Sequence, residues 1–163
     1  LFSSAGKSIR FKESDVRSVG RTAIGVRGIR LADKDKVVSL IVAESDDPIL
    51  TATEKGYGKR TQLDEYRAQA RGGSGVISIK TSDRNGQVVG AIQVTDEDEM
   101  MLISDKGTLV RARAADVSII GRNTQGVTLI NIADDEALVS VAKIAETDDD
   151  EEGTEEVEVK SEE

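Results

Sequence analysis

Short apolar runs recur along the chain, separated by polar segments that contain glycine. Three of them, at residues 37–42, 88–94 and 138–144, are rich in β-branched residues and too short for helices. A second run, at residues 49–53 and 100–104, follows the first two. The pattern predicts buried strands, so we expect an all-β fold.

Pairs of glycines mark three copies of one repeat. The two glycines of a pair are 19 positions apart, and the pairs are Gly6 and Gly25, Gly56 and Gly75, and Gly107 and Gly126. Each first glycine suits a tight turn between strands, because glycine adopts a positive φ without steric cost. A fourth strand is expected to open at each second glycine, over residues 25–31, 75–81 and 126–132. Four strands in a period of 50 to 51 residues predict blades of a propeller-like fold.

Segment 83–87, Asp-Arg-Asn-Gly-Gln, is typical of a hairpin between the fourth strand of the second copy and the first strand of the third. Sequence repeats and structural blades are therefore expected to be offset, with strands exchanged between neighbouring blades. Such units bury a core only by stacking on each other. The chain begins in the middle of a repeat, which we interpret as a piece of a longer protein.

Composition narrows the possible chemistry. The 163 residues include no cysteine and no histidine. This excludes disulfides, thiolate or imidazole metal sites, and Ser–His or Cys–His nucleophile pairs. No apolar run is long enough to cross a membrane, so a cytoplasmic protein without membrane contact is expected. We predict no catalytic residues, metal or cofactor in this chain.

The formal charge of −9 comes from one end of the chain. Residues 142–163 hold 11 of the 31 acidic residues and two of the 22 basic ones, so residues 1–141 have 20 of each. The last residues have too little apolar surface to fold. We therefore expect a folded domain over residues 1–144 and a disordered acidic tail over residues 145–163.

Basic residues recur near the marker glycines, at equivalent positions in the three copies. Repetition by a common rotation would arrange them as a stripe suited to a curved phosphate backbone. The candidate DNA-binding residues are Arg10, Lys12, Arg21, Lys59, Arg60, Arg71, Arg111, Arg113 and Arg122. Two structural alternatives are edge charges that discourage strand aggregation, and arginines that pair with the repeated acids Asp15, Glu65 and Asp116.

Residues 102–111 and 117–127, with the shorter segments 56–61 and 75–80, resemble the C-terminal domain of the bacterial DNA gyrase A protein. The resemblance implies a β-pinwheel, a propeller-like ring of roughly six blades with exchanged strands, of which this chain is the last half. In that family, basic residues on the outer rim bind duplex DNA without reading its sequence and wrap it, which directs negative supercoiling.

The family's hallmark is a heptapeptide, the gyrase A box, with the pattern Q-R-R-G-G-[KR]-G. Residues 69–75 occupy the equivalent place in the second copy, and we call them the box-equivalent loop. The loop departs from the pattern at Ala70 and Ser74, so only a supporting phosphate contact is carried over, to Arg71. The box itself, the cleavage tyrosine and the ATP site are expected to lie outside this chain.

The resemblance also implies partners. These are duplex DNA, and the rest of gyrase A with gyrase B in a heterotetramer, an ATP-dependent type II topoisomerase of the nucleoid in which ATP and Mg act elsewhere. An intramolecular contact of the acidic tail with the basic stripe is a further hypothesis. The alternatives are the corresponding C-terminal domain of topoisomerase IV and a propeller for protein interaction.

Overall fold

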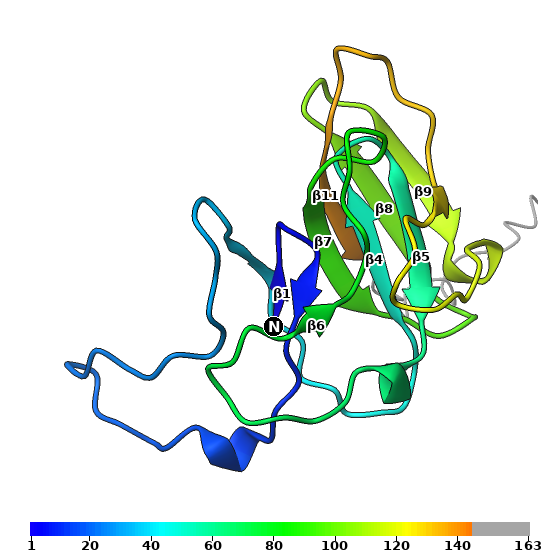
Figure 1. The fold of residues 1–163 in the computed structure, drawn as a ribbon. Helices are drawn as coiled ribbons and strands as arrows, with labels where there is room; N and C mark the ends of the chain where they lie inside the picture. The colour runs from blue at the N-terminus through cyan, green and yellow to red at the C-terminus, as the bar shows by residue number, and fades with distance from the viewer. Residues whose placement is uncertain (145–163) are drawn as a thin grey trace, which may run out of the picture.

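The computed structural model of the protein describes residues 1–144 and contains three antiparallel sheets (Figure 1). The first sheet has the order β3 (Val37–Ser39), β1 (Phe2–Ser3), β2 (Lys7–Ser8) and β6 (Val76–Ile77). The second has the order β10 (Val127–Thr128), β5 (Tyr57–Thr61), β4 (Ile49–Thr53) and β7 (Val88–Gln93). The third has the order β11 (Leu138–Lys143), β8 (Glu99–Ser104) and β9 (Leu109–Arg113). The predicted all-β, propeller-like class is confirmed.

Each complete sheet combines strands of two successive repeats. In the first sheet, β2 of the first copy pairs with β6 of the second, and Ser8 lies opposite Val76. In the second sheet, β5 of the second copy pairs with β10 of the third, and Gly58 lies opposite Val127. These two pairings occupy the same repeat positions, so one register governs both. The predicted offset and strand exchange are confirmed.

The first glycine of a repeat lies directly under the strand donated by the next repeat. The carbonyl oxygens of Gly6 and Gly56 accept hydrogen bonds from the amides of Ile79 and Ile130 at 3.3 and 3.2 Å. A Cβ atom on Gly6 or Gly56 would lie 2.3 Å from the carbonyl oxygen of the same isoleucine. Both glycines also have a positive φ, 77° and 76°. The turn and the close approach both require glycine.

Several strands differ from their predicted lengths. The fourth strands β6 and β10 contain two residues each. Residues 25–31 form no strand, because a fourth strand pairs with the preceding repeat and none of the strands in residues 1–144 is placed to receive this one. Strand β3 ends at Ser39 rather than Val42, since β1 begins at Phe2 and gives residues 40–42 no partner.

Segment 83–87 forms the predicted turn, but it connects two sheets rather than two strands of one hairpin. Its preceding strand β6 lies in the first sheet and its following strand β7 in the second. Asn85 is fully buried at this crossing, and its Nδ2 donates to the carbonyl oxygens of Lys80 at 2.8 Å and Gln125 at 3.0 Å. The Asn85 side chain therefore links the turn to the segment after β6 and to the segment before β10.

Two apolar clusters lie between the sheets. One contains Leu50, Met100, Leu102 and Leu138 and joins the second sheet to the third. The other contains Phe2 and Tyr66, whose rings meet edge to face with centroids 5.7 Å apart. Tyr66 is 3% exposed, so it is a core residue as predicted from its alignment with the valines of the other copies.

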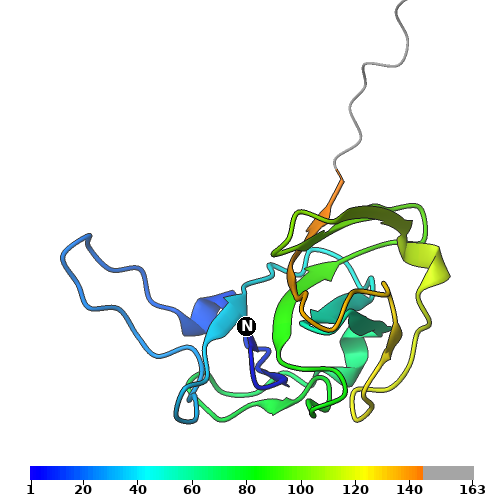
Figure 2. The same ribbon diagram turned by 90° about the horizontal axis from the view of Figure 1, so that it is seen from above.

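Three 3₁₀ turns follow the third strands at equivalent positions. They are η1 (Glu13–Asp15), η2 (Leu63–Glu65) and η3 (Ala114–Asp116). Each ends at the repeated acid that the sequence comparison identified, and the next residue is apolar or aromatic. After η1 the chain continues through an irregular segment that projects away from the sheets (Figure 2).

Candidate nucleic-acid interface

The arginine four residues after the first glycine is a structural residue in the first two copies. Arg60 is 4% exposed, and its Nε donates to the carbonyl oxygen of Val117 at 2.8 Å. Its Nη2 donates to the carbonyl oxygen of Ala115 at 3.4 Å, and its Nη1 pairs with Asp96. These carbonyl groups belong to η3 and the residue after it. Arg60 thus supplies hydrogen-bond donors to the carbonyl oxygens at the end of η3, in the next repeat.

Arg10 makes the equivalent contact one repeat earlier. Its Nη1 donates to the carbonyl oxygens of Leu63 at 3.1 Å and Tyr66 at 3.4 Å, at the two ends of η2. The residue is half-buried. The guanidinium groups of both copies therefore face protein carbonyl oxygens rather than open solvent.

Lys59 is fully buried and directs its charge into the third copy. Its Nζ donates to the carbonyl oxygens of Gly121 and Arg122, both at 2.6 Å, and to Oγ1 of Thr124 at 3.1 Å. Burial away from water lowers the pKa of Lys59 to about 8, although the carboxylate of Glu65 opposes the shift. Both cations are enclosed by protein oxygen atoms, which argues against the predicted contacts of Lys59 and Arg60 with DNA, and those contacts remain untested.

The second recurring arginine also binds the backbone of the preceding copy. Arg71 Nε donates to the carbonyl oxygen of Asp15 at 3.1 Å, and its Nη1 donates to that of Arg27. Arg122 Nη1 donates to the carbonyl oxygen of Ile77 at 2.7 Å, the position equivalent to Arg27. Carbonyl oxygens are thus the partners of these arginines, which differs from the pairing with repeated carboxylates that the sequence suggested. Their predicted phosphate contacts remain untested.

In the third copy the two arginines of β9 are exposed but paired with acids. Arg111 forms an ion pair with Glu99, and Arg113 forms one with Asp116 at 3.0 Å. Lys106 and Lys143 pair with Asp135 and Asp98, respectively. Segment 95–136 contains nine acidic and four basic residues. Phosphates would have to compete with carboxylates for these cations.

Basic residues outnumber acidic ones in residues 7–36, which we call the basic segment. It contains nine basic and four acidic residues. Eight of the basic side chains are exposed, and none of them forms an ion pair with another residue of the described part, 1–144: Lys7, Lys12, Arg17, Arg21, Arg27, Arg30, Lys34 and Lys36. Lys12 and Arg21 were predicted site residues. Arg27, Arg30, Lys34 and Lys36 were not among the predicted residues, although a charge count by repeat would have singled out this part of the chain.

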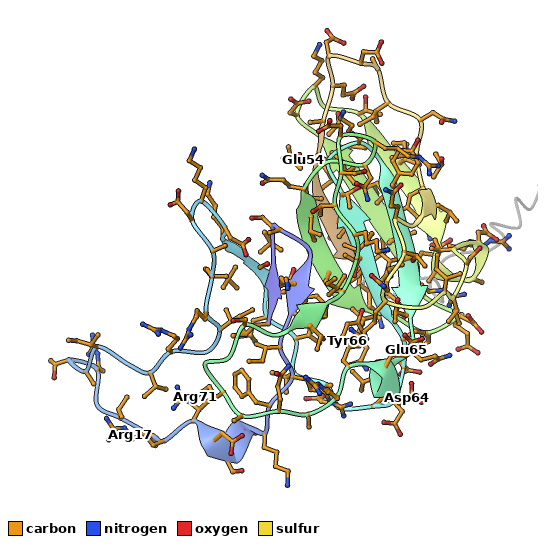
Figure 3. The ribbon with its side chains drawn as sticks, in the orientation of Figure 1. Arg17, Glu54, Asp64, Glu65, Tyr66 and Arg71 are labelled. Atoms are coloured by element: carbon orange, nitrogen blue, oxygen red, sulfur yellow. The ribbon has the colours of Figure 1, made fainter. Side chains whose placement is uncertain are left out.

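The box-equivalent loop holds the basic segment against the sheets. The Gly72 amide donates to the carbonyl oxygen of Gly28 at 2.7 Å, and the Arg30 amide donates to that of Gly73 at 2.8 Å. Arg71 adds its two contacts at Asp15 and Arg27. Figure 3 shows Arg17 on the projecting part of the segment, with Arg71 closer to the sheets. The loop thus positions exposed cations that it does not itself supply.

The family model described as the DNA gyrase C-terminal domain, a β-propeller, matches residues 1–44, 47–95 and 98–145. The chain belongs to this family. It is 62% identical over 152 residues to the DNA gyrase A protein of Klebsiella oxytoca, covering 93% of this chain and 17% of that protein. This gyrase domain chain therefore spans about a sixth of the length of that relative.

Solved structures of the gyrase family share the fold. The structure of a DNA gyrase A C-terminal domain matches with a TM-score of 0.82 and 32% identity, covering 88% of this chain and 49% of that one. The C-terminal domain of a DNA topoisomerase IV matches with the same TM-score and 26% identity, covering 88% and 45%. Both comparison domains are thus about twice as long as the matched part.

Two further kinds of feature were sought in the described part of this gyrase domain, a metal site and a membrane-spanning helix. Within residues 1–144, no group of three or more acidic side chains is placed to hold a metal ion. None of the described helical segments is long and apolar enough to cross a membrane.

Proposed function

We propose that this chain is a DNA-binding and DNA-wrapping part of gyrase A, and that the basic segment makes its main phosphate contacts. The observation that carries the proposal is the set of eight exposed cations without an acidic partner among the described residues. The 62% identity to a gyrase A protein favours gyrase over topoisomerase IV. Membership of the gyrase family supports duplex DNA as the ligand.

The proposed contacts are electrostatic and do not depend on base sequence. Each lysine or arginine that neutralises a phosphate releases a counterion, so affinity falls as salt rises. Bending a site of about 20 to 30 base pairs costs on the order of 1 to 6 kcal/mol, so a wrapped path needs many contacts. The basic segment would anchor DNA at the first sheet, and the acidic third copy would repel it.

We further propose that the supercoiling activity resides in a larger assembly. In that assembly the rest of gyrase A and gyrase B would join this domain, and ATP and Mg would act outside it. The domain itself would supply no catalytic group and would work by fixing the path of the DNA. Its proposed setting is the bacterial cytoplasm, at the nucleoid. The hypothesis of a regulatory acidic tail concerns residues outside the described part of the chain.

A salt series on a short duplex tests the proposed interface. The variant Arg17→Ala/Arg21→Ala/Arg27→Ala is expected to bind more weakly than the parent, with the slope of log affinity against log salt flatter by about 2.7 if each arginine neutralises one phosphate. The matched control is Arg111→Ala/Arg113→Ala, which removes paired cations and is expected to change the slope by less than about 1. Binding is measured by fluorescence anisotropy of a labelled duplex.

Two results would count against this interface. An equal loss in the control variant would place the contacts on the third copy instead. Absent or salt-insensitive binding by the parent chain would favour the protein-interaction propeller, in which the cations are edge charges.

A further inference from the structure

The loop of residues 121–124, which we call the Arg122 loop, lies between two opposite charges of the second copy. The carbonyl oxygens of Gly121 and Arg122 each accept a hydrogen bond of 2.6 Å from Nζ of Lys59. On the other side, the Arg122 amide donates to Oε2 of Glu65 at 3.0 Å. A Cβ atom on Gly121 would lie 3.6 and 3.9 Å from the two carboxylate oxygens of Glu65. A buried ammonium thus holds one face of the loop, and a carboxylate covers the other.

The peptide groups of this loop are oriented to bind an anion. In a trans peptide, the C=O of one residue and the N–H of the next point in opposite directions. The carbonyl oxygens of Gly121 and Arg122 face Lys59, which is mainly protonated at about pH 7 because its pKa is about 8. The amides of Arg122 and Asn123 therefore face away from it, and Asn123 is exposed. Adjacent amides with a positive charge behind them favour carboxylate or phosphate oxygens.

Further cations flank the loop. The Arg122 guanidinium donates through Nη1 to the last carbonyl oxygen of β6, while its buried Nε has no hydrogen-bond partner among residues 1–144. The Lys80 amide donates to the carbonyl oxygen of Thr124 at 2.8 Å, and Arg84 Nη1 donates to Oε1 of Gln125 at 3.5 Å. The side chains of Lys80 and Arg84 are exposed and form no ion pair within that range. Together these charges attract an anion to the loop.

The equivalent loop one repeat earlier is held by other contacts. There Ile9, which is 2% exposed, takes the place of Lys59. Asp15, at the position of Glu65, contributes its carbonyl oxygen to Arg71. The repeat can therefore form this loop without a buried cation on one face and a bound carboxylate on the other. The two charges are a property of the Arg122 loop rather than of the fold.

We propose that the Arg122 loop is a phosphate site, and that the Glu65 carboxylate occupies it until a phosphate displaces it. This inference rests on the proposed function, since the ligand would be a phosphate of duplex DNA. Glu65 is exposed, so water can solvate its carboxylate after displacement. Other cations of the chain hold the same duplex, which raises the effective concentration of phosphate at the loop. Glu65 is thus a built-in competitor of DNA.

Full-length Glu65→Gln and its matched control Asp64→Asn test this competition. Each variant removes one negative charge from η2, where Figure 3 shows both residues, and of the two it is Glu65 that binds the loop. Fluorescence anisotropy of a labelled duplex at low salt measures affinity. Glu65→Gln is expected to bind about threefold or more tighter than Asp64→Asn, because it removes a competitor in addition to a repulsive charge.

A second measurement tests the site without DNA. Inorganic phosphate is added to isotope-labelled protein, and NMR follows the amide resonances of Arg122 and Asn123. We expect these resonances to shift at lower phosphate concentration in Glu65→Gln than in the parent or in Asp64→Asn. The same spectra show whether each variant is folded. A phosphate response by a chain that binds no duplex would contradict the proposed function and support the phosphate site.

Two outcomes would overturn the proposal. Equal gains in DNA affinity for Glu65→Gln and Asp64→Asn would reduce the effect of Glu65 to general charge repulsion. Resonances of Arg122 and Asn123 that stay unchanged in Glu65→Gln at every phosphate concentration would show that the loop binds no phosphate.

Discussion

Arg60 shows why a cation that recurs in the sequence need not lie on a binding surface. Its guanidinium group lies on carbonyl oxygens of a turn 57 residues later in the chain. The period of the repeat identified the position, but its function depends on which repeat packs over it. The arginine recurs because of the fold: a 3₁₀ turn that packs over a third strand has carbonyl oxygens that need a hydrogen-bond donor.

Arg60→Ala is expected to lower the free energy of unfolding by about 1 to 3 kcal/mol, since carbonyl groups of the next repeat lose their donor. Affinity for DNA per folded molecule is expected to be unchanged. Arg111→Ala, which removes an exposed ion pair, is expected to cost less than about 1 kcal/mol. Urea unfolding measures both, and equal costs for the two variants would refute the structural role.

Lys59 predicts a pH dependence of stability. Its pKa is about 8 in the folded protein and 10.5 for an ordinary lysine, so between these values the unfolded chain binds more protons. The contribution of Lys59 to the free energy of unfolding must therefore rise with pH across this window. Urea unfolding at about pH 7 to pH 10 measures the free energy of unfolding of the parent and of Lys59→Met. The value for the parent minus the value for the variant is expected to increase with pH. Parallel curves for the two proteins would show that the Lys59 pKa is ordinary.

At the scale of single elements, the prediction succeeded where both neighbours of a strand are present. The apolar run 49–53 corresponds to β4, which has β5 and β7 on its two sides. Residues 25–31 have a similar pattern but form no strand, because β structure needs an edge to pair with. Sequence periodicity identifies a strand's side-chain pattern and cannot show whether its partner is there.

The two turn glycines Gly56 and Gly107 offer a test of strand donation. Alanine at either position incurs the cost of a positive φ, but only Gly56→Ala also places a Cβ atom against the carbonyl oxygen of Ile130. Gly56→Ala is therefore expected to lower the free energy of unfolding by at least about 1 kcal/mol more than Gly107→Ala. Equal costs would mean that donation adds no constraint at Gly56.

At the scale of the whole molecule, charge is graded along the repeats. The basic segment has an excess of five basic residues, and segment 95–136 has an equal excess of acidic residues. The even distribution predicted from the recurring arginines missed this gradient, because alignment emphasises what the copies share. Their differences lie in loops, where exposed charges accumulate without disturbing the core.

Strand exchange also has a consequence for synthesis on the ribosome. Ser8 and Val76 pair although they are 68 residues apart, and Gly58 and Val127 pair over a similar separation. At about 5 to 20 residues per second, each hairpin remains without its closing strand for about 3 to 14 s after it emerges. During that interval, adjacent nascent chains on one messenger RNA expose the same acceptor edge. Translation speed across each repeat would thus influence how often neighbouring nascent chains become entangled.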